Sequence, residues 1–438
     1  MTGPSSQRRP EVVFADTTAG IDRAMARLLD QFGGPASLLR SSRDVYLKVN
    51  LVDRQPQSYT DPQVIEAAIR QFQRGGARRV YVIENSTQGN FTRLVFAATG
   101  VDRLCRRLGA IPVYLDETPA HPVYLDGLES FVDLSSFVFE RLIADRERNL
   151  YVSLPKLKTH SMTGVTLAIK NQYGLLHHHS RSADHNFKLH QKIADLYRLL
   201  RPDFAVVDGL FATNHGHYLA VRNADRCVVP MNCLIGGPDP LAVDVVAAAF
   251  LGFERSDVEH LERAAETGIG EGRRSEIEIV GRELFDGRRQ KLTAELLDGF
   301  PADIRVLRGA TRCCREGCWR NTETVVELLR ADYGGAGGFT IVMGKDADPA
   351  AIRALRGPVH LAGSCAIQDH GVALTRRLGS GLVTTSPGCN DLAATIHALT
   401  HHMKVSPLRL SGVHPLRAVA LLAEARLRRS RAIIPPLL

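Results

Sequence analysis

The sequence lacks several features, each of which would point to a particular class of protein. No apolar run approaches about eighteen residues, so no membrane span is expected. No apolar stretch follows the basic residues near the start, which argues against a secretory signal, and we expect a cytoplasmic protein. A GxxxxGK[ST] phosphate loop and a convincing GxGxxG fingerprint are also absent, so nothing supports ATP or NAD dependence.

Lysine is scarce as well, with 9 Lys against 46 Arg. The net charge of +8 is a small excess for 438 residues and forms no long basic block, which favours a focused anion site over a nucleic-acid surface. Five of the lysines nevertheless fall within 37 residues: Lys156, Lys158, Lys170, Lys188 and Lys192. Chance clustering on a solvated face is the alternative explanation.

The length and the alternation of apolar runs with helical patterns predict two α/β units. Residues 1–300 are expected to form the first, a Rossmann-like domain with a parallel sheet. Charged residues dominate 255–300, which we interpret as a peripheral segment or boundary. The expected strands are Val45–Val49, Arg79–Ile83, Leu150–Leu154, Phe204–Val207 and Cys227–Ile235, and the expected helices are Asp61–Gln73, His190–Leu200 and Leu241–Phe250.

Residues 301–438 are expected to form a smaller α/β unit that contains most of the cysteines. Its last segment, 414–438, is an Arg-rich amphipathic pattern ending in IIPPLL and predicts a docking helix. The expected strands are Ile304–Leu307, Phe339–Met343, Pro358–Ala362 and Leu382–Thr385, with helices near 321–332, 348–355 and 390–403.

Polar residues follow the expected strands of the first unit. Ligands of open parallel sheets bind at the carboxyl ends of strands, so these residues predict a pocket that holds an anion and moves a proton. Burial and neighbouring cations would lower the pKa of Lys158 or Lys170 toward that of a base or nucleophile, and His160 would transfer protons. In the alternative, the lysines pair with acidic neighbours and His160 binds the backbone. The residues are Lys48, Asn50, Glu84, Lys156, Lys158, His160 and Asp208.

An ordered set of motifs resembles the family catalogued as domain of unknown function 362, from about residue 45 to 255. The motifs are Lys48-Val-Asn50, TDPQVIEAAIRQFQRGGARRVYVIENS, Pro155-Lys-Leu-Lys-Thr-His160, Gly164, Lys170-Asn171, Gly174, His190, Asp208-Gly209 and GGPDPLAVDVVAAA. The resemblance implies an α/β domain often found with iron–sulfur modules. It adds Asn171 and His190 to the expected substrate-binding residues.

The same region is more distantly similar to nickel-pincer lactate racemase, which also places a His, a Gly-rich turn and a Lys after a strand. By order, His160, Lys170 and His190 correspond to functional positions. This likeness implies proton or hydride movement beside a carboxylate, with the lysine engaged covalently or electrostatically.

The run His177-His-His179, followed by His185, is a further candidate. Imidazoles are common ligands of zinc and transition metals. Three consecutive side chains do not aim at one ion without special backbone geometry, and the flanking Ser180, Arg181 and Asp184 are polar. We therefore expect a mobile polar loop.

Five of the eight cysteines lie in the second unit. In a cytoplasmic protein they suggest metal or redox work, and two of them should emerge at one sheet edge where CCREGC meets them. Four thiolates suit a [4Fe–4S] cluster or zinc, with unliganded thiols as the third possibility; nearby glycines favour the cluster. The expected ligands are Cys314, Cys318, Cys365 and Cys389, with Cys313 the alternative to Cys314. Cys105, Cys227 and Cys233 lie in apolar stretches and are expected in the core.

The Gly-rich GxC and the later GC also resemble a C-terminal module that accompanies this family. In the usual form prolines follow the second motif, whereas Asn390-Asp391 follow it here. Together these features predict an iron–sulfur oxidoreductase acting on a small carboxylate-bearing or phosphorylated anion, with an electron donor such as a ferredoxin. The alternatives are a non-catalytic electron-transfer or metal-handling protein and a redox-neutral racemase or lyase.

Overall fold

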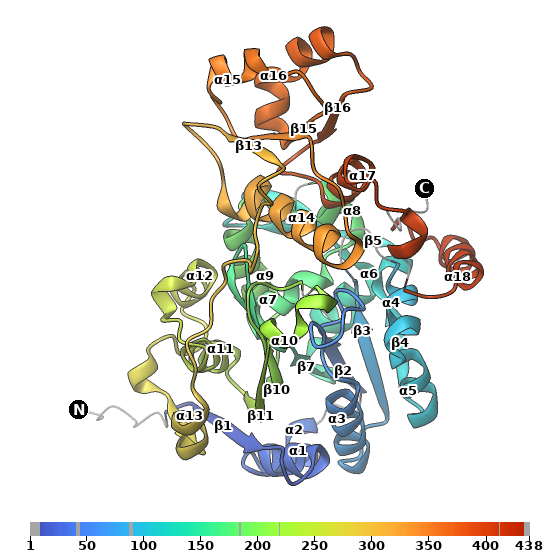
Figure 1. Ribbon diagram of the computed structural model, residues 1–438. Coiled ribbons are helices and arrows are strands. Elements are labelled where there is room, and N and C mark those ends of the chain that lie inside the picture. The colour runs from blue at the N-terminus through green and yellow to red at the C-terminus, as the bar shows by residue number, and fades with distance from the viewer. Residues whose placement is uncertain are drawn as a thin grey trace.

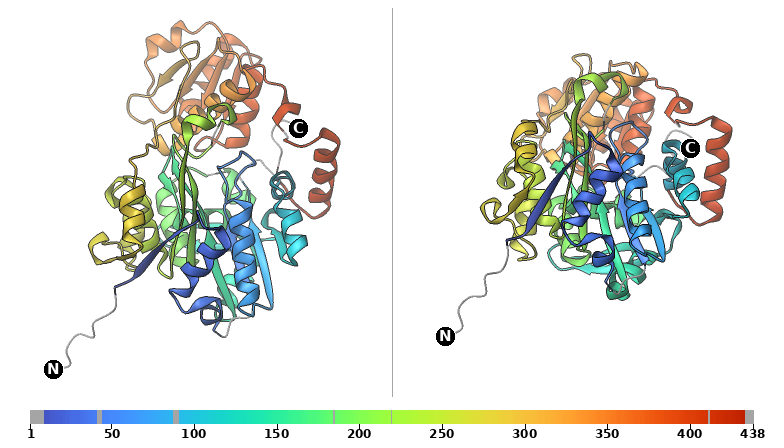
Figure 2. Two further views of the ribbon diagram at one scale, coloured as in Figure 1. Left: turned by 60° about the horizontal axis from the view of Figure 1, so that its bottom comes forward. Right: turned by 90° about the horizontal axis from the view of Figure 1, so that it is seen from below.

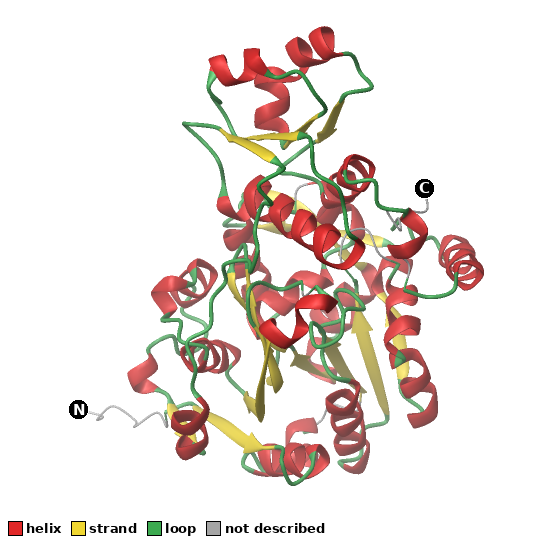
Figure 3. Ribbon diagram, in the orientation of Figure 1, coloured by secondary structure: helices red, strands yellow, loops and turns green. Residues whose placement is uncertain are grey.

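The structure is a computed structural model and contains two α/β units (Figure 1), each with a sheet between helices (Figure 3). It describes residues 9–40, 44–86, 91–183, 185–218, 220–410 and 412–432. The first eight residues and IIPPLL at 433–438 lie outside the described residues. Among those described, no helix combines the length and the apolar content that crossing a bilayer requires.

The larger unit is built on one sheet whose main path runs β12-β1-β11-β10-β7-β2-β3-β4. The contacts from β10 to β4 and between β1 and β12 are parallel. β8 and β9 form a side branch from β10. The strands are β1 (Glu11–Asp16), β2 (Asp44–Val49), β3 (Arg79–Glu84), β4 (Ile111–Tyr114), β7 (Asn149–Leu154), β8 (Lys156–His160), β9 (Gly164–Thr166), β10 (Phe204–Thr213), β11 (Val228–Gly237) and β12 (Glu278–Val280).

The expected parallel sheet is confirmed except at β11, which is antiparallel to both β10 and β1. A parallel return needs a crossover connection, usually a helix. The link from β10 to β11 holds only two short helical turns, Val221–Asn223 and α10 (Ala224–Cys227), so the chain turns back beside the strand it has left.

Helices cover both faces of this sheet and enclose two cores. α3 (Pro62–Arg74) begins where Asp61 accepts a hydrogen bond from the Gln63 amide, with Pro62 in its first turn. α11 (Pro240–Phe250) is buried along its whole length, and Asp239 caps it in the same way. On the α3 face lie α1 (Ile21–Asp30), α2 (Gly34–Leu39) and α5 (Val101–Leu108); on the α11 face lie α7 (Ala168–Asn171), α9 (Leu189–Leu199) and α12 (Glu259–Glu266).

The segment 255–300 belongs to the larger unit. β12 pairs with β1, and Leu261 and Phe285, the latter in α13 (Arg282–Arg288), are buried in the same core. The remaining short elements of this unit are α4 (Thr92–Thr99), β5 (Ala120–Leu125), β6 (Ser130–Ser135), α6 (Ser136–Phe139) and α8 (His178–Ala183).

The smaller unit has four parallel strands in sequential order, β13 (Arg305–Arg308), β14 (Thr340–Met343), β15 (Val359–Ala362) and β16 (Val383–Ser386). All four expected strands are confirmed. The expected helices correspond to α14 (Arg320–Tyr333), α15 (Pro349–Ala354) and α17 (Leu392–His402). A further helix, α16 (Ser364–Leu378), was not predicted, because its Gly and polar residues obscure the apolar spacing.

The expected C-terminal docking helix is α18 (Pro415–Leu427), which returns to the larger unit beside α4 (Figures 1 and 2). Ala418 and Ala425 pack against Phe91 and Leu94, and Glu424 pairs with Arg93 at 3.1 Å.

Candidate active site

A cavity of about 140 Å³ lies where the carboxyl ends of β2, β3 and β8 meet the smaller unit. Its polar wall comes from the larger unit, and α14 and α17 of the smaller unit complete it. Seven of the ten residues predicted for catalysis and substrate binding line it: Lys48, Asn50, Glu84, Lys158, His160, Lys170 and Asn171.

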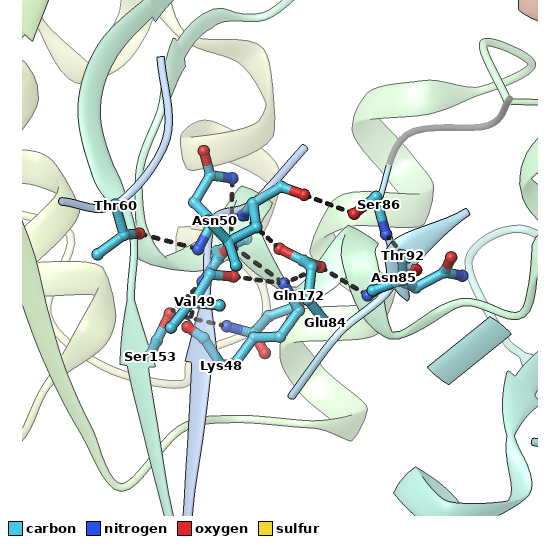
Figure 4. Close-up of polar contacts among 12 residues, drawn as sticks. Lys48, Val49, Asn50, Thr60, Glu84, Asn85, Ser86, Thr92, Ser153 and Gln172 are labelled. Carbon is cyan, nitrogen blue, oxygen red and sulfur yellow. Dashed lines mark hydrogen bonds and ion pairs between the residues drawn. The ribbon is translucent and has the colours of Figure 1, made fainter. Parts of the chain in front are cut away.

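Lys48 and Glu84 form a buried ion pair at one side of the cavity (Figure 4). Their Nζ and Oε1 atoms are 2.6 Å apart, and both side chains are 1% exposed. Glu84 also accepts hydrogen bonds from the Leu51 and Asn85 amides, each at 2.8 Å. The two charges cancel, so this pair stabilises the strand ends and leaves the cavity without a net negative charge.

Asn171 connects this pair to the rest of the wall. Its Oδ1 accepts from Lys48 Nζ at 3.3 Å and from Asn50 Nδ2 at 3.4 Å, while its Nδ2 donates to the Lys48 carbonyl at 2.9 Å. Asn50 Oδ1 is buried and has no hydrogen-bond partner among the described residues. Asn50 therefore presents a spare acceptor at the cavity.

Lys156 and Asp208 pair with each other away from the cavity, at 3.0 Å and almost fully buried. Asp208 also accepts from the amides of Asp61 and Leu210. Lys156–His160, which follow β7 as expected, form a strand of their own, β8, parallel to β10 and antiparallel to β9. The alternative, in which Lys158 and Lys170 pair with acidic neighbours, does not hold, because Glu84 and Asp208 pair with Lys48 and Lys156 instead.

Lys158 and Lys170 have no such partner among the described residues. Lys158 Nζ donates to the Ser58 carbonyl at 2.6 Å. Burial, with the neighbouring Lys170 charge, holds the pKa of Lys158 well below its usual range. Burial and the charge of Arg181 lower the pKa of Lys170 to about 7. Lys170 is therefore poised between ammonium and free amine near neutral pH.

Asp244 fixes the backbone that carries Lys170. Its two carboxylate oxygens accept hydrogen bonds from the amides of Ala168 and Ile169, each at 2.7 Å, at the first turn of α7. Burial raises the pKa of Asp244 to about 8. The motif GGPDPLAVD thus supplies two caps, Asp239 for its own helix and Asp244 for the short helix that bears Lys170.

His160 stacks on His217, with ring centroids 3.6 Å apart and planes 4° from parallel. Burial holds the pKa of both imidazoles well below the usual range, so both are neutral. The Met162 amide donates to His160 Nδ1 at 3.2 Å. Nδ1 is therefore the acceptor nitrogen, and the proton of neutral His160 sits on Nε2.

Sequence reasoning missed His217 and Arg181. His217 follows the carboxyl end of β10, but the predicted strand ended at Val207, six residues before the observed end. Arg181 comes from the histidine-rich segment, where the expectation of a loop is wrong because α8 forms there. Its guanidinium donates to the carbonyls of Asn85 and Ser86. Nothing in the sequence marks it among 46 arginines.

The other histidines of that segment are distributed differently. His177 is buried and its amide donates to the Asp133 carbonyl at 2.7 Å, while His185 lines the cavity. The side chain of His179 and the whole of Asp184 lie outside the described residues.

His190, a predicted substrate-binding residue, lies outside the cavity lining, on α9. Its Nε2 is 3.7 Å from Glu259, and its ring stacks at 6.0 Å on buried His260.

The cysteines of the smaller unit gather at the carboxyl edge of its sheet. Cys365 opens α16 directly after β15, and Cys389 follows β16. Arg312 forms a hydrogen bond with Cys314, and this contact, together with Cys365 and Cys389, raises the pKa of the guanidinium.

Cys313, the alternative to Cys314, forms a hydrogen bond with Cys318. Gly363, beside Cys318, has a φ of 89°, a backbone conformation that favours glycine, and a Cβ there would make only ordinary contact with Cys318 Sγ at 3.9 Å. The donor set is thus of the right chemistry for a thiolate-bound metal. Within the part of the chain that is described, however, no three metal-ligating side chains lie close enough to share an ion.

The remaining three cysteines, Cys105, Cys227 and Cys233, are buried in the larger unit as expected.

The thiol edge and the cavity are direct neighbours. His185 Nδ1 lies 2.6 Å from Asn186 Oδ1, and Asn186 Nδ2 donates to the Cys389 carbonyl at 3.1 Å. Asn321, which lines the cavity from α14, donates to the Asn390 carbonyl at 2.9 Å. A single hydrogen-bonded layer therefore separates the two groups of residues.

The chain is similar to a family model, to a curated protein and to solved structures. Residues 45–249 match the family model described as Domain of unknown function (DUF362). A thylakoid-associated protein of Synechocystis sp. is 23% identical over 257 residues, which are 56% of this chain and 74% of that protein. A crystal structure of a Thermotoga maritima protein has 9% identity and a TM-score of 0.33, covering 87% of this chain and 82% of that one, which is too low a score to support an argument.

Proposed function

Residues 45–249 are a domain of the DUF362 family, and from this premise we propose that the chain is an enzyme that binds a small anion in the cavity and moves a proton. The observation that carries the proposal is the set of basic side chains without acidic partners. Lys158, Lys170 and Arg181 all line the cavity, and none of them has a carboxylate within ion-pair distance among the described residues.

An entering anion changes the protonation of these groups. Its negative charge favours the ammonium forms of Lys158 and Lys170, so each takes up a proton from solvent as the anion binds. Arg181 is held by two backbone carbonyls and supplies a fixed positive charge. A carboxylate or a phosphoryl group fits this set equally well by charge.

The proton step uses Lys170 as the base. In the fraction of complexes that keep Lys170 as the free amine, a fraction that grows as the pH rises, Nζ accepts a proton from a C–H or O–H group of the substrate and becomes an ammonium ion, while the bonding electron pair stays on the substrate. His160 Nε2–H and Arg181 then donate hydrogen bonds to the oxygen on which the charge develops. The reverse transfer restores the amine.

For the cysteines we propose a [4Fe–4S] cluster held by Cys314, Cys318, Cys365 and Cys389, with zinc as the alternative. Its support is the donor chemistry and the position of the cysteines at a shared sheet edge. When bound, a cluster would supply electrons singly, which makes the enzyme an oxidoreductase with an external donor such as a ferredoxin.

A redox-neutral racemase or lyase is the second candidate. It is favoured by the absence of a preformed coordination shell among the described thiols and by the completeness of the proton-transferring groups without one.

Hydrogen exchange tests the proton step. Incubated in D₂O with a panel of 2-hydroxy and 2-oxo carboxylates, the protein should incorporate deuterium next to a carboxylate, as read by NMR, and Lys170→Met should abolish this. The exposed Lys291→Met is the matched control. Exchange that persists in Lys170→Met would refute the assigned base.

Metal analysis after anaerobic purification tests the cluster. Iron and acid-labile sulfide should be present and should be lost in Cys318→Ala, but kept in the buried control Cys227→Ala. If zinc is present and iron and sulfide are not, the zinc alternative is selected. If the protein contains no iron, no acid-labile sulfide and no zinc, the redox proposal is refuted. Deuterium exchange that survives in Cys318→Ala would favour the redox-neutral enzyme.

A further inference from the structure

The two walls of the cavity differ in chemistry. The wall from the larger unit carries the lysines, the arginine and the histidines described above. The wall from the smaller unit lies outside the family-matched segment and is mainly apolar, with Asn321, Thr324 and Tyr333 as its polar members. Its apolar side chains are Val325, Leu328, Leu329, Leu392, Ile396 and Leu410.

Two of these apolar side chains are only partly covered by the protein's own hydrophobic cores. Leu328 is half-buried, lines the cavity and belongs to no hydrophobic core among the described residues. Ile396, also half-buried, packs only at the margin of its core. Apolar surface left facing a water-filled cavity is unfavourable, so a ligand that covers it gains affinity.

The apolar wall is held against the polar wall. The hydroxyls of Ser161 and Thr324 share a hydrogen bond at 3.3 Å, and Arg54 donates to the Tyr333 hydroxyl at 3.3 Å. Both contacts join the larger unit to α14. A ligand that reaches the basic groups is therefore also within the space bounded by α14 and α17.

We propose that the cavity takes an amphipathic carboxylate, whose charged end lies at Lys158 and Lys170 and whose apolar tail lies against Leu328 and Ile396. This inference rests on the proposed function for the charged end and adds the class of the tail. It also assigns the choice of substrate to the smaller unit, since that unit supplies most of the apolar side chains of the cavity.

The volume of the cavity limits the size of the apolar tail that it can hold. A cavity of about 150 Å³ is enough to hold one benzene molecule. The cavity of about 140 Å³ therefore accepts an apolar part of about six carbon atoms. Branched-chain, aromatic and medium-chain carboxylates fit, whereas a long fatty acyl chain does not.

Calorimetric titration of the full-length protein with acetate, butanoate, hexanoate and octanoate tests the proposal. Burial of each methylene should tighten binding about fourfold from acetate to hexanoate, with little further gain at octanoate. Leu328→Gln should reduce the advantage of hexanoate over acetate about tenfold. Leu416→Gln, on exposed α18 and outside the cavity, is the matched control and should keep the wild-type series.

The outcomes separate this inference from the proposed function. Equal affinity for all four carboxylates would overturn the tail and leave the anion site intact. Failure of every carboxylate to bind would overturn this inference, and failure of inorganic phosphate to bind as well would overturn the anion site. Lys170→Met should weaken all four by a similar factor; selective loss of hexanoate in that variant would contradict the assignment of the two walls.

Discussion

The pKa of Lys170 gives anion binding a defined dependence on pH. In the free protein this pKa is about 7, because the group is buried beside Arg181 and Lys48. An anion about 4 Å away contributes about 4 kcal/mol at an effective dielectric constant of about 20, which raises the pKa of Lys170 by about three units. The complex then binds one more proton than the free protein between about pH 7 and 10.

Affinity for a carboxylate should therefore fall about tenfold for each pH unit above 7, or about a hundredfold from pH 7 to 9, and level off below pH 7. Any proton taken up by Lys158 adds to this slope. Lys170→Met removes one proton from the linkage, so its plot of log Kd against pH should be less steep by about one.

Calorimetry with hexanoate from pH 6 to 9 measures both slopes, with Lys291→Met as the control for loss of a surface charge. The ligand is fully ionised across this range, so only the protein titrates. A slope in Lys170→Met equal to that of the wild type would show that another group takes up the proton and would refute the role given to Lys170.

Three further substitutions test the ion pair, the helix cap and the close packing that surround the cavity. Glu84→Gln should lower the free energy of unfolding by about 3–5 kcal/mol in urea, since it leaves a buried lysine unpaired, whereas surface Glu66→Gln should cost under about 1 kcal/mol; equal losses would contradict this. Asp244→Asn leaves one α7 amide without an acceptor and should lower the free energy of unfolding by about 1–3 kcal/mol. It should also shift the pH midpoint of hexanoate binding, and an unchanged midpoint would argue against a positioning role for Asp244. Gly174→Ala places a Cβ 2.5 Å from Glu84 Oε1 and should cost about 1–3 kcal/mol, while Gly287→Ala, with open space around it, should be neutral; a neutral Gly174→Ala would contradict the close approach.

The strands and helices with strong patterns were predictable from the sequence. Val45–Val49 and Leu150–Leu154 are mainly apolar runs, and α3 carries Asp-Pro at its start and Gly-Gly after its end. The carboxyl-end rule then found Lys48, Glu84 and Lys158 without knowledge of the sheet order. What the sequence could not supply was the partner of each charge, since Lys156 and Lys158 differ by two positions and only the former meets Asp208.

The apolar wall and the missed site residues depend on contacts between distant segments. Leu328 lies in an ordinary amphipathic helix, and its position over the cavity follows from the docking of a second unit, which no local pattern records. His217 was lost because β10 extends into TNHGH rather than ending at Val207. The thiol edge was predictable from Gly-Cys motifs after apolar strands, although α16, which carries Cys365 in its first turn, was not.

The return of α18 to α4 means that the smaller unit is attached to the larger one at both of its ends. A unit attached at one end only can rotate in any direction about that attachment, whereas attachment at both ends restricts its rotation to the axis that joins them. The position of α14 and α17 at the cavity thus depends on a peripheral helix outside the cavity lining as well as on the direct hydrogen bonds between the two units. Substitutions in the contact formed by Ala418, Ala425 and Phe91 would loosen the attachment of α18 to the larger unit. They would thereby change ligand entry although they lie outside the cavity.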